Sequence, residues 1–265
     1  MIKTSFHRTL SCKICDQEAN YVFNSTILKK YEISYFQCTN CKYLFTEKPF
    51  WLEEAYKEPI NISDTGLVER NIYLSKITSR VLFYLFDHEG TYLDYGGGYG
   101  LYVRLMRDIG FNFLWDDIFT TNLLSKGFEF SNESIELLTC FETFEHLENP
   151  IIEIEKMLKI SSNILFTTEL YPEPMPSPEN WWYYALDHGQ HISFYNLRTL
   201  NFIADKFDLN IYSNGTNLHL FTSKKLNKYI WQMLISKRFL FILDKLMKRK
   251  LISKTWTDHI KAKSV

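Results

Sequence analysis

The stretch LDYGGGYG, residues 93–100, decides the fold of this 265-residue chain. Residues 91–94 predict a short buried strand that ends in Asp94, and residues 101–109 have helical spacing and stop at Gly110. Three glycines stand at alternate positions of the turn between them: Gly96, Gly98 and Gly100. Glycine allows a sharp turn and a close approach of ligand to backbone. Strand, glycine-rich turn and helix form the opening unit of a doubly wound nucleotide-binding fold.

Acidic residues narrow the choice of ligand. Asp94 lies at the strand end, where a carboxylate repels phosphate and attracts a cationic, amino-acid-like ligand. Residues 111–115 predict a second strand that ends at Asp116 and Asp117, with Asp117 placed to bind ribose hydroxyls. This pattern resembles class I S-adenosylmethionine (SAM) methyltransferases, whose first motif is acid-x-Gly-x-Gly-x-Gly. The resemblance implies that Asp94, the three glycines, Asp117 and Phe141 bind SAM; the alternative is an ordinary glycine turn.

Composition is typical of a globular enzyme. Hydrophobic residues make up 46% of the chain and aromatic residues 17%, which is ample for one large domain or two unequal ones. No apolar run reaches the roughly 18 residues that a membrane span needs. The segment MIKTSFHRTLSC has no apolar region of a secretory signal, which favours a cytoplasmic location.

Four of the five cysteines form two CxxC pairs near the N-terminus: Cys12, Cys15, Cys38 and Cys41. Each pair supplies two thiolates, and together they predict a structural Cys₄ zinc site. Residues 21–27 and 32–37 alternate between apolar and polar side chains and predict a hairpin between the pairs. Disulfides are the alternative, which a cytoplasmic location disfavours. Cys140 is left over in a buried strand and is expected to serve packing.

The second half of the core is marked by further strands. They are predicted at residues 127–130, which is the least clear of the set, and at 135–140, 163–168, 211–213 and 218–223. Pro150 stands at a favoured first-turn position and predicts the start of a helix. The last two strands fit the terminal antiparallel pair that this methyltransferase class carries.

The clearest chemical signal follows the strand at 135–140. Glu142, Glu145 and His146 have i, i+3, i+4 spacing and would share one face of a helical turn. Two carboxylates and an imidazole suit Mg²⁺ or Mn²⁺. A later Gly-x-His, ending at His191, resembles a motif of ubiquinone-pathway O-methyltransferases and small-RNA 2′-O-methyltransferases. Those enzymes pair Glu-x-x-Glu-His with a later histidine to hold a metal, which implies His191 as the fourth ligand.

The alternative for these residues is that they cap turns or hydrogen-bond the substrate without a metal. In either case His146 or His188 is the candidate general base. The preceding segment, residues 172–191, holds four prolines and the aromatic run WWYY at 181–184. It is interpreted as a lid that binds the acceptor on its aromatic surface, or as a long loop anchored by its tryptophans.

Taken together, these motifs resemble bacterial SAM-dependent methyltransferases that carry an N-terminal zinc ribbon and are associated with surface-polysaccharide biosynthesis. The resemblance covers roughly residues 10–222. It implies an α/β Rossmann-like sheet with a zinc ribbon and a helical tail. The expected segments are a ribbon (1–48), a helical connector or lid (49–90), a SAM-binding core (91–223) and a basic tail (224–265).

The implied activity is O-methylation of a sugar, nucleotide-sugar or related small acceptor, assisted by a divalent metal. One alternative is a sugar C- or N-methyltransferase, although the large C-terminal domain usual in sugar C-methyltransferases is absent from this sequence. Another is a non-catalytic SAM fold that binds nucleic acid. The intact glycine motif and the acidic core argue against the nucleic-acid module.

Charge is unevenly distributed along the chain. Residues 224–265 hold twelve basic and two acidic side chains, so the tail carries +10 while the net charge is −1. Basic residues here interleave with apolar ones, which predicts a helix with a break near Ser236. Such a helix can lie on the inner, anionic face of a membrane. The alternative is that its apolar side packs on the core or on a second subunit.

Overall fold

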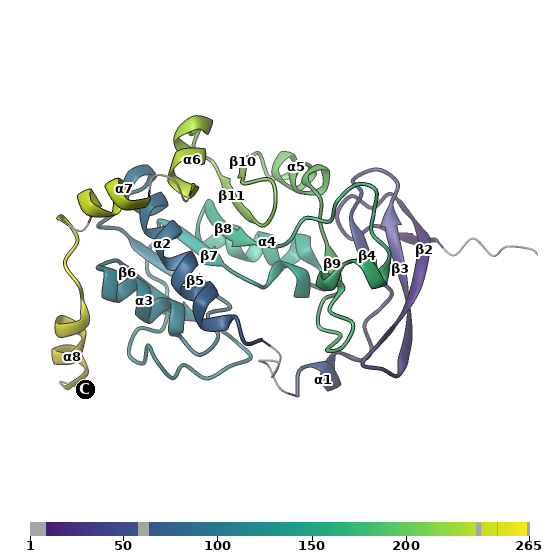
Figure 1. Cartoon of the computed structure of the whole chain (residues 1–265), viewed down its shortest axis with the longest axis horizontal. Helices are drawn as coiled ribbons and strands as arrows, with labels where there is room; N and C mark the ends of the chain where they lie inside the picture. The colour runs from purple at the N-terminus through teal and green to yellow at the C-terminus, as the bar shows by residue number, and fades with distance from the viewer. Residues whose placement is uncertain (1–8, 58–63, 237–239, 248, 264–265) are drawn as a thin grey trace, which may run out of the picture. The chain divides into compact units, whose positions relative to one another are not determined.

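The structure is a computed structural model that describes residues 9–57, 64–236, 240–247 and 249–263 (Figure 1). The chain divides into two compact units. Unit 1 comprises Met1–Asn61, Glu142–Lys156 and Thr167–His219. Unit 2 comprises Ile62–Phe141, Met157–Phe166 and Leu220–Val265. Each unit therefore draws on several separate stretches of sequence, whereas the four predicted segments are consecutive.

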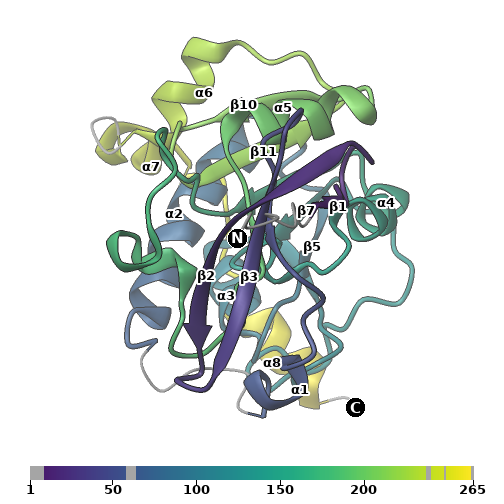
Figure 2. The same ribbon diagram turned by 90° about the vertical axis from the view of Figure 1, so that its right-hand side faces the viewer.

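Unit 1 is built on a five-stranded sheet with the order β1-β2-β3-β4-β9. Its strands are β1 (Thr9–Ser11), β2 (Glu18–Ile27), β3 (Tyr31–Cys38), β4 (Leu44–Thr46) and β9 (Ser193–Phe194). β2 and β3 form the hairpin predicted between the cysteine pairs, and Figure 2 shows them running side by side. β9 joins the sheet from far along the chain by pairing with β4, with Leu44 opposite Phe194. The sequence pattern did not predict this strand.

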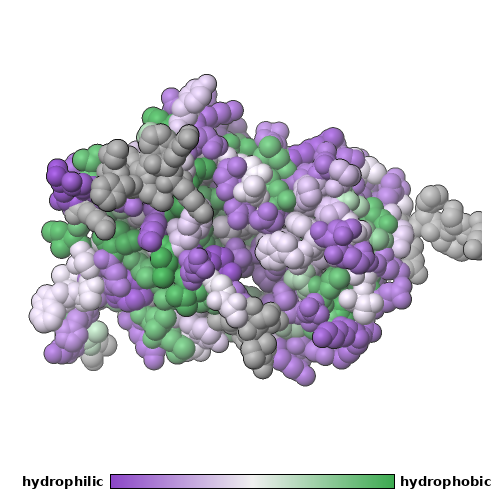
Figure 3. Space-filling view, viewed as in Figure 1, coloured by the Kyte–Doolittle hydropathy of each residue, from purple (hydrophilic) through white to green (hydrophobic). Residues whose placement is uncertain are grey.

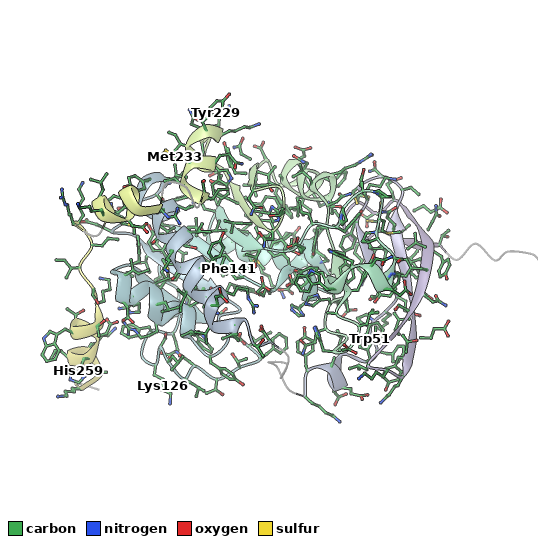
Figure 4. The ribbon with its side chains drawn as sticks, viewed as in Figure 1. Trp51, Lys126, Phe141, Tyr229, Met233 and His259 are labelled. Carbon is green, nitrogen blue, oxygen red and sulfur yellow. The ribbon has the colours of Figure 1, made fainter. Side chains whose placement is uncertain are left out.

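Short helices complete unit 1: α1 (Leu52–Ala55), the 3₁₀ turns η1 (Phe144–His146), η2 (Pro178–Asn180) and η3 (Trp182–Tyr184), and α5 (Leu197–Lys206). In the proline-rich loop, Trp181, Tyr183 and Tyr184 are buried, while Trp182 is 77% exposed. Trp181 and Tyr184 belong to one core cluster with Trp51. Three of the four aromatic residues therefore anchor the loop, as one of the two sequence interpretations expected. Figure 4 marks Trp51, whose indole N–H donates to the Gly189 carbonyl at 2.7 Å.

The second sheet has six strands in the order β10-β11-β8-β7-β5-β6. Its strands are β5 (Thr91–Tyr95), β6 (Asn112–Asp116), β7 (Leu137–Cys140), β8 (Asn163–Thr167), β10 (Asn210–Ser213) and β11 (Leu218–Thr222). β5 pairs in parallel with both β6 and β7, and β7 pairs in parallel with β8. The strand expected at 127–130 is reduced to a bridge between Trp115 and Glu129. This arrangement confirms the α/β Rossmann-like sheet.

Helices flank this sheet as the sequence predicted. They are α2 (Leu67–Leu85), α3 (Leu101–Ile109) and α4 (Pro150–Ile160). α3 ends at Gly110, whose positive φ of 125° suits glycine, and α4 begins at Pro150 as expected. Within unit 2, α2 lies beside α3 (Figure 1), and Figure 3 shows hydrophobic surface over this region, where Val68 and Ile72 are exposed.

The basic tail is helical and belongs to unit 2. It contains α6 (Lys228–Ile235), α7 (Leu240–Met247) and α8 (Thr255–Lys263). α6 ends at Ile235 and Ser236 is extended, which confirms the predicted break near Ser236. Trp231 and Leu234 are buried on α6, and the buried guanidinium of Arg80 in α2 donates to the Leu234 carbonyl at 2.7 Å. Tyr229, on the outer side of α6, is 86% exposed (Figure 4).

An ion pair between α3 and α8 holds the last helix of the tail in place. Arg107 of α3 donates to both carboxylate oxygens of Asp258 in α8, at 2.8 Å each. The apolar side of α6 and the Asp258 carboxylate of α8 therefore make contacts within unit 2. These contacts favour packing of the tail over a membrane role. The tail residues Lys237, Arg238 and Lys248 and the side chain of Phe241 lie outside the described residues. Among the described residues, no helix is long and apolar enough to cross a membrane.

Candidate active site and metal centres

The glycine turn of unit 2 leaves room for a ligand beside its backbone. Gly96 and Gly97 donate their N–H groups to the Asp116 carbonyl, at 2.9 and 3.1 Å, which ties the turn to the end of β6. Gly98 has a φ of +53°, and a Cβ at this position would meet no atom within 4 Å. Gly100 has a φ of +83°, and a Cβ there would lie 2.7 Å from the Asn122 Oδ1. Gly100 is therefore required by packing, whereas Gly98 borders open space.

Asp94 is a buried acid at the end of β5. Its carboxyl is 4% exposed and accepts a hydrogen bond from the Thr139 hydroxyl at 2.7 Å. Burial raises the pKa of Asp94 to about 7; the Thr139 bond lowers it and the charge of Asp117 raises it further. A cation beside Asp94 favours the ionised form, so this site is suited to a positively charged ligand.

Replacing Asp94 by asparagine is expected to have opposite effects on stability and binding. Because the folded pKa of Asp94 is raised from 3.8 to about 7, its contribution to stability is present at low pH and is lost as the pH rises through about 7. At pH 8 the ligand-free Asp94→Asn protein should therefore be more stable, by on the order of 2–4 kcal/mol. SAM affinity should fall by about ten- to a hundredfold.

Thermal melts at pH 4 and pH 8, with calorimetric SAM titrations, measure both effects. The stabilisation should be largely lost near pH 4, because the Asp94 carboxyl of the unfolded chain then also takes up a proton. Unchanged SAM affinity in Asp94→Asn would remove Asp94 from the cofactor site.

The two acids after β6 have different environments. Asp117 accepts three backbone hydrogen bonds, from Gly98 at 2.9 Å, Phe119 at 2.7 Å and Thr120 at 2.8 Å. Its carboxylate therefore holds the glycine turn and the following loop together. Asp116 is the last residue of β6 and lies opposite Tyr95 of β5. Burial and then the charge of Asp117 raise the pKa of Asp116, whose backbone carbonyl bonds the glycine turn and whose carboxylate is partly desolvated.

This difference makes Asp116 the better candidate for the ribose ligand, and it predicts distinct phenotypes. Asp116→Asn should weaken SAM binding by about ten- to a hundredfold with little change in melting temperature. Asp117→Ala should lower the free energy of unfolding by about 1–2 kcal/mol, because it removes the acceptor of three N–H groups. Calorimetry and thermal melts of the two variants test the assignment. If both variants melt at the temperature of the native protein and only Asp117→Ala loses SAM affinity, Asp117 is the ribose ligand.

The four N-terminal cysteines of unit 1 converge. Cys12 and Cys41 have their sulfur atoms 3.5 Å apart, and Cys15 and Cys38 have theirs 3.4 Å apart. These separations are far longer than the roughly 2.05 Å of a disulfide and close to those around a tetrahedral zinc ion. The Ile14 N–H donates to the Cys12 Sγ at 3.4 Å, which is a favourable bond for a thiolate ligand. The residues present therefore fit zinc.

A second group of metal-binding side chains lies in unit 1. Ligand atoms of Glu145, His146 and His191 lie within 4.8 Å of one another. Glu145 is fully buried, and the Ile192 N–H donates to the Glu145 carbonyl at 2.9 Å. Because Ile192 is followed by β9, the five-stranded sheet positions His191 next to the Glu145–His146 turn. The sequence predicted these three residues as a set, and the structure brings them together.

We call Glu145, His146 and His191 the histidine cluster. Hydrogen bonds to Nδ1 orient both of its imidazole rings. The Nδ1 of His191 lies 2.7 Å from the Tyr183 carbonyl, and the Nδ1 of His146 lies 3.1 Å from the Gln190 carbonyl. A carbonyl only accepts, so the Nδ1 of His191 carries the proton and its Nε2 keeps the lone pair. The Nδ1 of His146 also lies 2.9 Å from the Tyr56 hydroxyl, which can donate to it or accept from it. Burial lowers the pKa of His146 to about 4 and lowers that of His191 as well. Both rings are therefore neutral at pH 7 and fit a metal ion.

Two of the predicted residues, Glu142 and His188, are outside the group of shared ligand atoms, although the His188 ring lies edge-on to that of His191 at 5.2 Å between centroids. The predicted helical turn through Glu142 is wrong, because η1 begins at Phe144 and Glu142 has a φ of +52°. The Glu142 carboxylate instead accepts a hydrogen bond from the Thr167 hydroxyl at 2.8 Å. His188 is outside the group of shared ligand atoms, and its Nδ1 accepts from the Gln190 N–H at 3.3 Å.

Phe141 of unit 2 lies at the end of β7, with its ring edge-on to Tyr102 at 5.1 Å between centroids (Figure 4).

The sequence analysis missed two residues that contact the histidine cluster. The Tyr56 hydroxyl lies 2.9 Å from the His146 Nδ1, and Tyr183 supplies the carbonyl for His191. Tyr56 follows α1 and has no motif around it, so only the tertiary structure identifies it.

The fold and the glycine turn define the class of this protein as a class I, Rossmann-like methyltransferase with a four-cysteine cluster in an N-terminal antiparallel sheet. Residues 69–214 match the protein family described as "Methyltransferase domain". The chain belongs to this family of SAM-dependent methyltransferases.

Comparison with curated proteins finds no match. Among solved structures, TnmH is 14% identical, with a TM-score of 0.47 over 67% of this chain and 62% of that one. CalO1, a methyltransferase in calicheamicin biosynthesis, is 13% identical, with a TM-score of 0.44 over 66% and 60%. An O-methyltransferase family protein from Burkholderia thailandensis is 11% identical, with a TM-score of 0.47 over 71% and 66%. The chain thus spans less than two thirds of the length of each of these proteins.

Proposed function

We propose that this protein transfers a methyl group from SAM to a hydroxyl oxygen of a sugar, a nucleotide sugar or a related small acceptor. The observation that carries the proposal is the histidine cluster, Glu145, His146 and His191, which begins shortly after the end of β7. The unprotonated ring nitrogens of its two imidazoles are suited to take up the proton of a hydroxyl or to hold a metal that acidifies it.

The chemical step needs positioning and proton removal. SAM supplies an activated methyl group on a positively charged sulfur, so the protein need not activate the donor. Asp94 and Asp116 would hold the cationic and ribose ends of SAM, while the open backbone at Gly98 would admit it. A positioned base contributes about 10²–10⁴-fold to such a reaction. Neutral His146 or His191 fits this role, because each neutral ring keeps one nitrogen with a lone pair at pH 7.

The donor set also suits a metal ion. Two imidazoles and one carboxylate are typical of zinc, manganese or iron sites, whereas Mg²⁺ prefers oxygen ligands. With Glu142 outside the set, Mn²⁺ remains a better candidate than Mg²⁺. A bound ion would lower the pKa of an acceptor hydroxyl. Glu145, His146 and His191 would hold it, with Tyr183 and Gln190 orienting the rings through their carbonyls.

We also propose that this methyl transfer serves surface-glycan biosynthesis. It rests on the order of motifs, a cysteine ribbon followed by a methyltransferase core, and on the net acidic charge of the chain ahead of the tail. Five free cysteines suit a reducing, cytoplasmic compartment. The tail then serves packing, and contact with the inner face of the membrane is the weaker interpretation of its charge.

The test is transfer of isotope-labelled methyl from SAM to extract fractions that contain nucleotide sugars and glycan intermediates. Labelled product should release its methyl only under conditions that cleave an ether, which identifies O-methylation. A label on carbon or nitrogen, or no transfer to any carbohydrate fraction, would overturn the proposed acceptor chemistry.

A further inference from the structure

A cavity of about 590 Å³ lies within unit 1, apart from the histidine cluster. Its wall includes two carboxylates, a guanidinium, an amide and two aromatic rings: Glu169, Glu173, Arg198, Asn196, Tyr171 and Trp181. This volume is in the range of small-molecule sites. The Leu170 and Tyr171 N–H groups donate to the Thr216 and Tyr195 carbonyls, at 2.8 and 2.9 Å. The backbone therefore sets the shape of the wall.

Asn196 organises the polar side of the cavity. Its side-chain NH₂ donates to the Glu173 Oε1 at 3.2 Å and to the Tyr171 hydroxyl at 3.1 Å. Its Oδ1 accepts from the Thr199 N–H at 2.9 Å and so caps α5. Asn196 is buried, so this network holds the Glu173 carboxylate in one place at the cavity wall.

The chemistry of the wall favours a neutral, hydroxyl-rich ring. Two carboxylates against one guanidinium repel phosphate groups and accept hydrogen bonds from hydroxyls. The rings of Tyr171 and Trp181 are inclined at 74°, with centroids 6.5 Å apart, and cannot sandwich a flat base between parallel faces. A pyranose needs only one aromatic side chain against its C–H face.

The cavity is linked to the histidine cluster through Tyr183. The Tyr183 ring lies 5.3 Å from the Trp181 ring and 4.7 Å from the His191 ring, between centroids. Glu169 is also close enough to Glu142 for their charges to interact, since burial first and then Glu142 raise the pKa of Glu169. A ligand against Trp181 would therefore be separated from His191 by two side chains, those of Trp181 and Tyr183.

We propose that this cavity binds a neutral pyranose ring of the methyl acceptor, with Glu169 and Glu173 accepting hydrogen bonds from its hydroxyls. The assignment rests on the proposed function and narrows its acceptor class to carbohydrate. A nucleobase or a phosphorylated sugar bound through its phosphate is excluded from this cavity.

The test uses the full-length, zinc-loaded protein with S-adenosylhomocysteine and measures binding of the methyl glycosides of glucose, galactose and mannose by saturation-transfer NMR. Glucose 6-phosphate and adenosine are the counter-probes. At least one methyl glycoside should bind, and both counter-probes should not compete with it. Binding of adenosine alone, or of none of the glycosides, overturns the assignment.

Three variants test whether the methyl glycoside binds in this cavity. Glu173→Ala should weaken the glycoside by about tenfold, the loss of one charge-assisted hydrogen bond. Thr216→Tyr, at an exposed wall position, should fill the cavity and abolish binding. The matched control Glu179→Ala, exposed in the same loop but outside the wall, should bind normally. Equal affinities in all three would overturn the cavity assignment.

Methyl transfer is measured on the same samples. Glycoside binding without any transfer contradicts the proposed activity and leaves the cavity assignment intact. Transfer to a sugar with a KM unaffected by Thr216→Tyr contradicts the cavity assignment alone.

Discussion

We expect Cys12→Ser to abolish zinc binding at the cysteine cluster and to unfold the five-stranded sheet of unit 1. Structural zinc contributes about 10–16 kcal/mol in zinc-finger peptides, which is as large as the whole stability of a typical domain. The cysteines join the turn after β1 to the turn between β3 and β4, and β1 and β4 have only three residues each. Elemental analysis should show one zinc per chain in the native protein and none in the variant, with loss of near-ultraviolet dichroism from the aromatic core.

Zinc loss should also abolish methyl transfer, although the cysteines hold no substrate. β9 pairs with β4, and His191 lies just ahead of β9, so a disordered sheet releases His191 from Glu145 and His146. SAM affinity should change little, because the glycine turn belongs to unit 2. The control is Cys140→Ala, which removes the one cysteine outside the cluster and should keep its zinc. Full zinc content in Cys12→Ser would contradict the zinc site.

His191→Ala is expected to lower kcat for methyl transfer by about 10²–10⁴-fold. The variant loses the Nε2 atom that serves as base or metal ligand, whereas its SAM dissociation constant should stay the same. If the cluster holds a metal, this variant should lose one equivalent of it, and EDTA should inactivate the native enzyme until Mn²⁺ or Zn²⁺ is restored.

His188→Ala is the matched control, because His188 lies three residues away and outside the shared ligand group. Its kcat should remain within about threefold of the native value, because His188 packs against the His191 ring at 5.2 Å between centroids but offers no atom to the ligand group. Equal losses in both variants would mean that His188 shares the chemistry. Full activity of the native protein in EDTA would leave Glu145, His146 and His191 as a proton-transfer site without a metal.

Local sequence determined those parts of the structure that depend on neighbouring residues. The turn at Gly96–Gly100 needs positive φ angles that only glycine adopts freely, and the strand and helix on either side of it are its immediate neighbours in the chain. The CxxC spacing brings two thiolates to one corner of a site, so the spacing alone predicts the cysteine cluster. Pro150 and Gly110 likewise act within one helical turn.

Contacts between distant segments were decided only by the tertiary structure. Glu142 had suitable helical spacing, yet its backbone takes a left-handed conformation and its carboxylate bonds Thr167, 25 residues away. Asp117 was chosen by spacing, and the fold shows that its carboxylate accepts hydrogen bonds from three backbone N–H groups, whereas Asp116 is the last residue of β6; which of the two binds the ribose stays a prediction.

β9 shows the same limit for a whole strand. Two residues carry no periodic pattern, so nothing in the sequence around Ser193 predicts that it pairs with β4. The sequence by itself determined the class of enzyme and its metal-binding residue types, because these depend on short-range backbone and ligand chemistry. Only the folded chain decided that Glu142 stays outside the group of Glu145, His146 and His191 and that Tyr56 reaches His146, because those contacts depend on long-range strand pairing and burial.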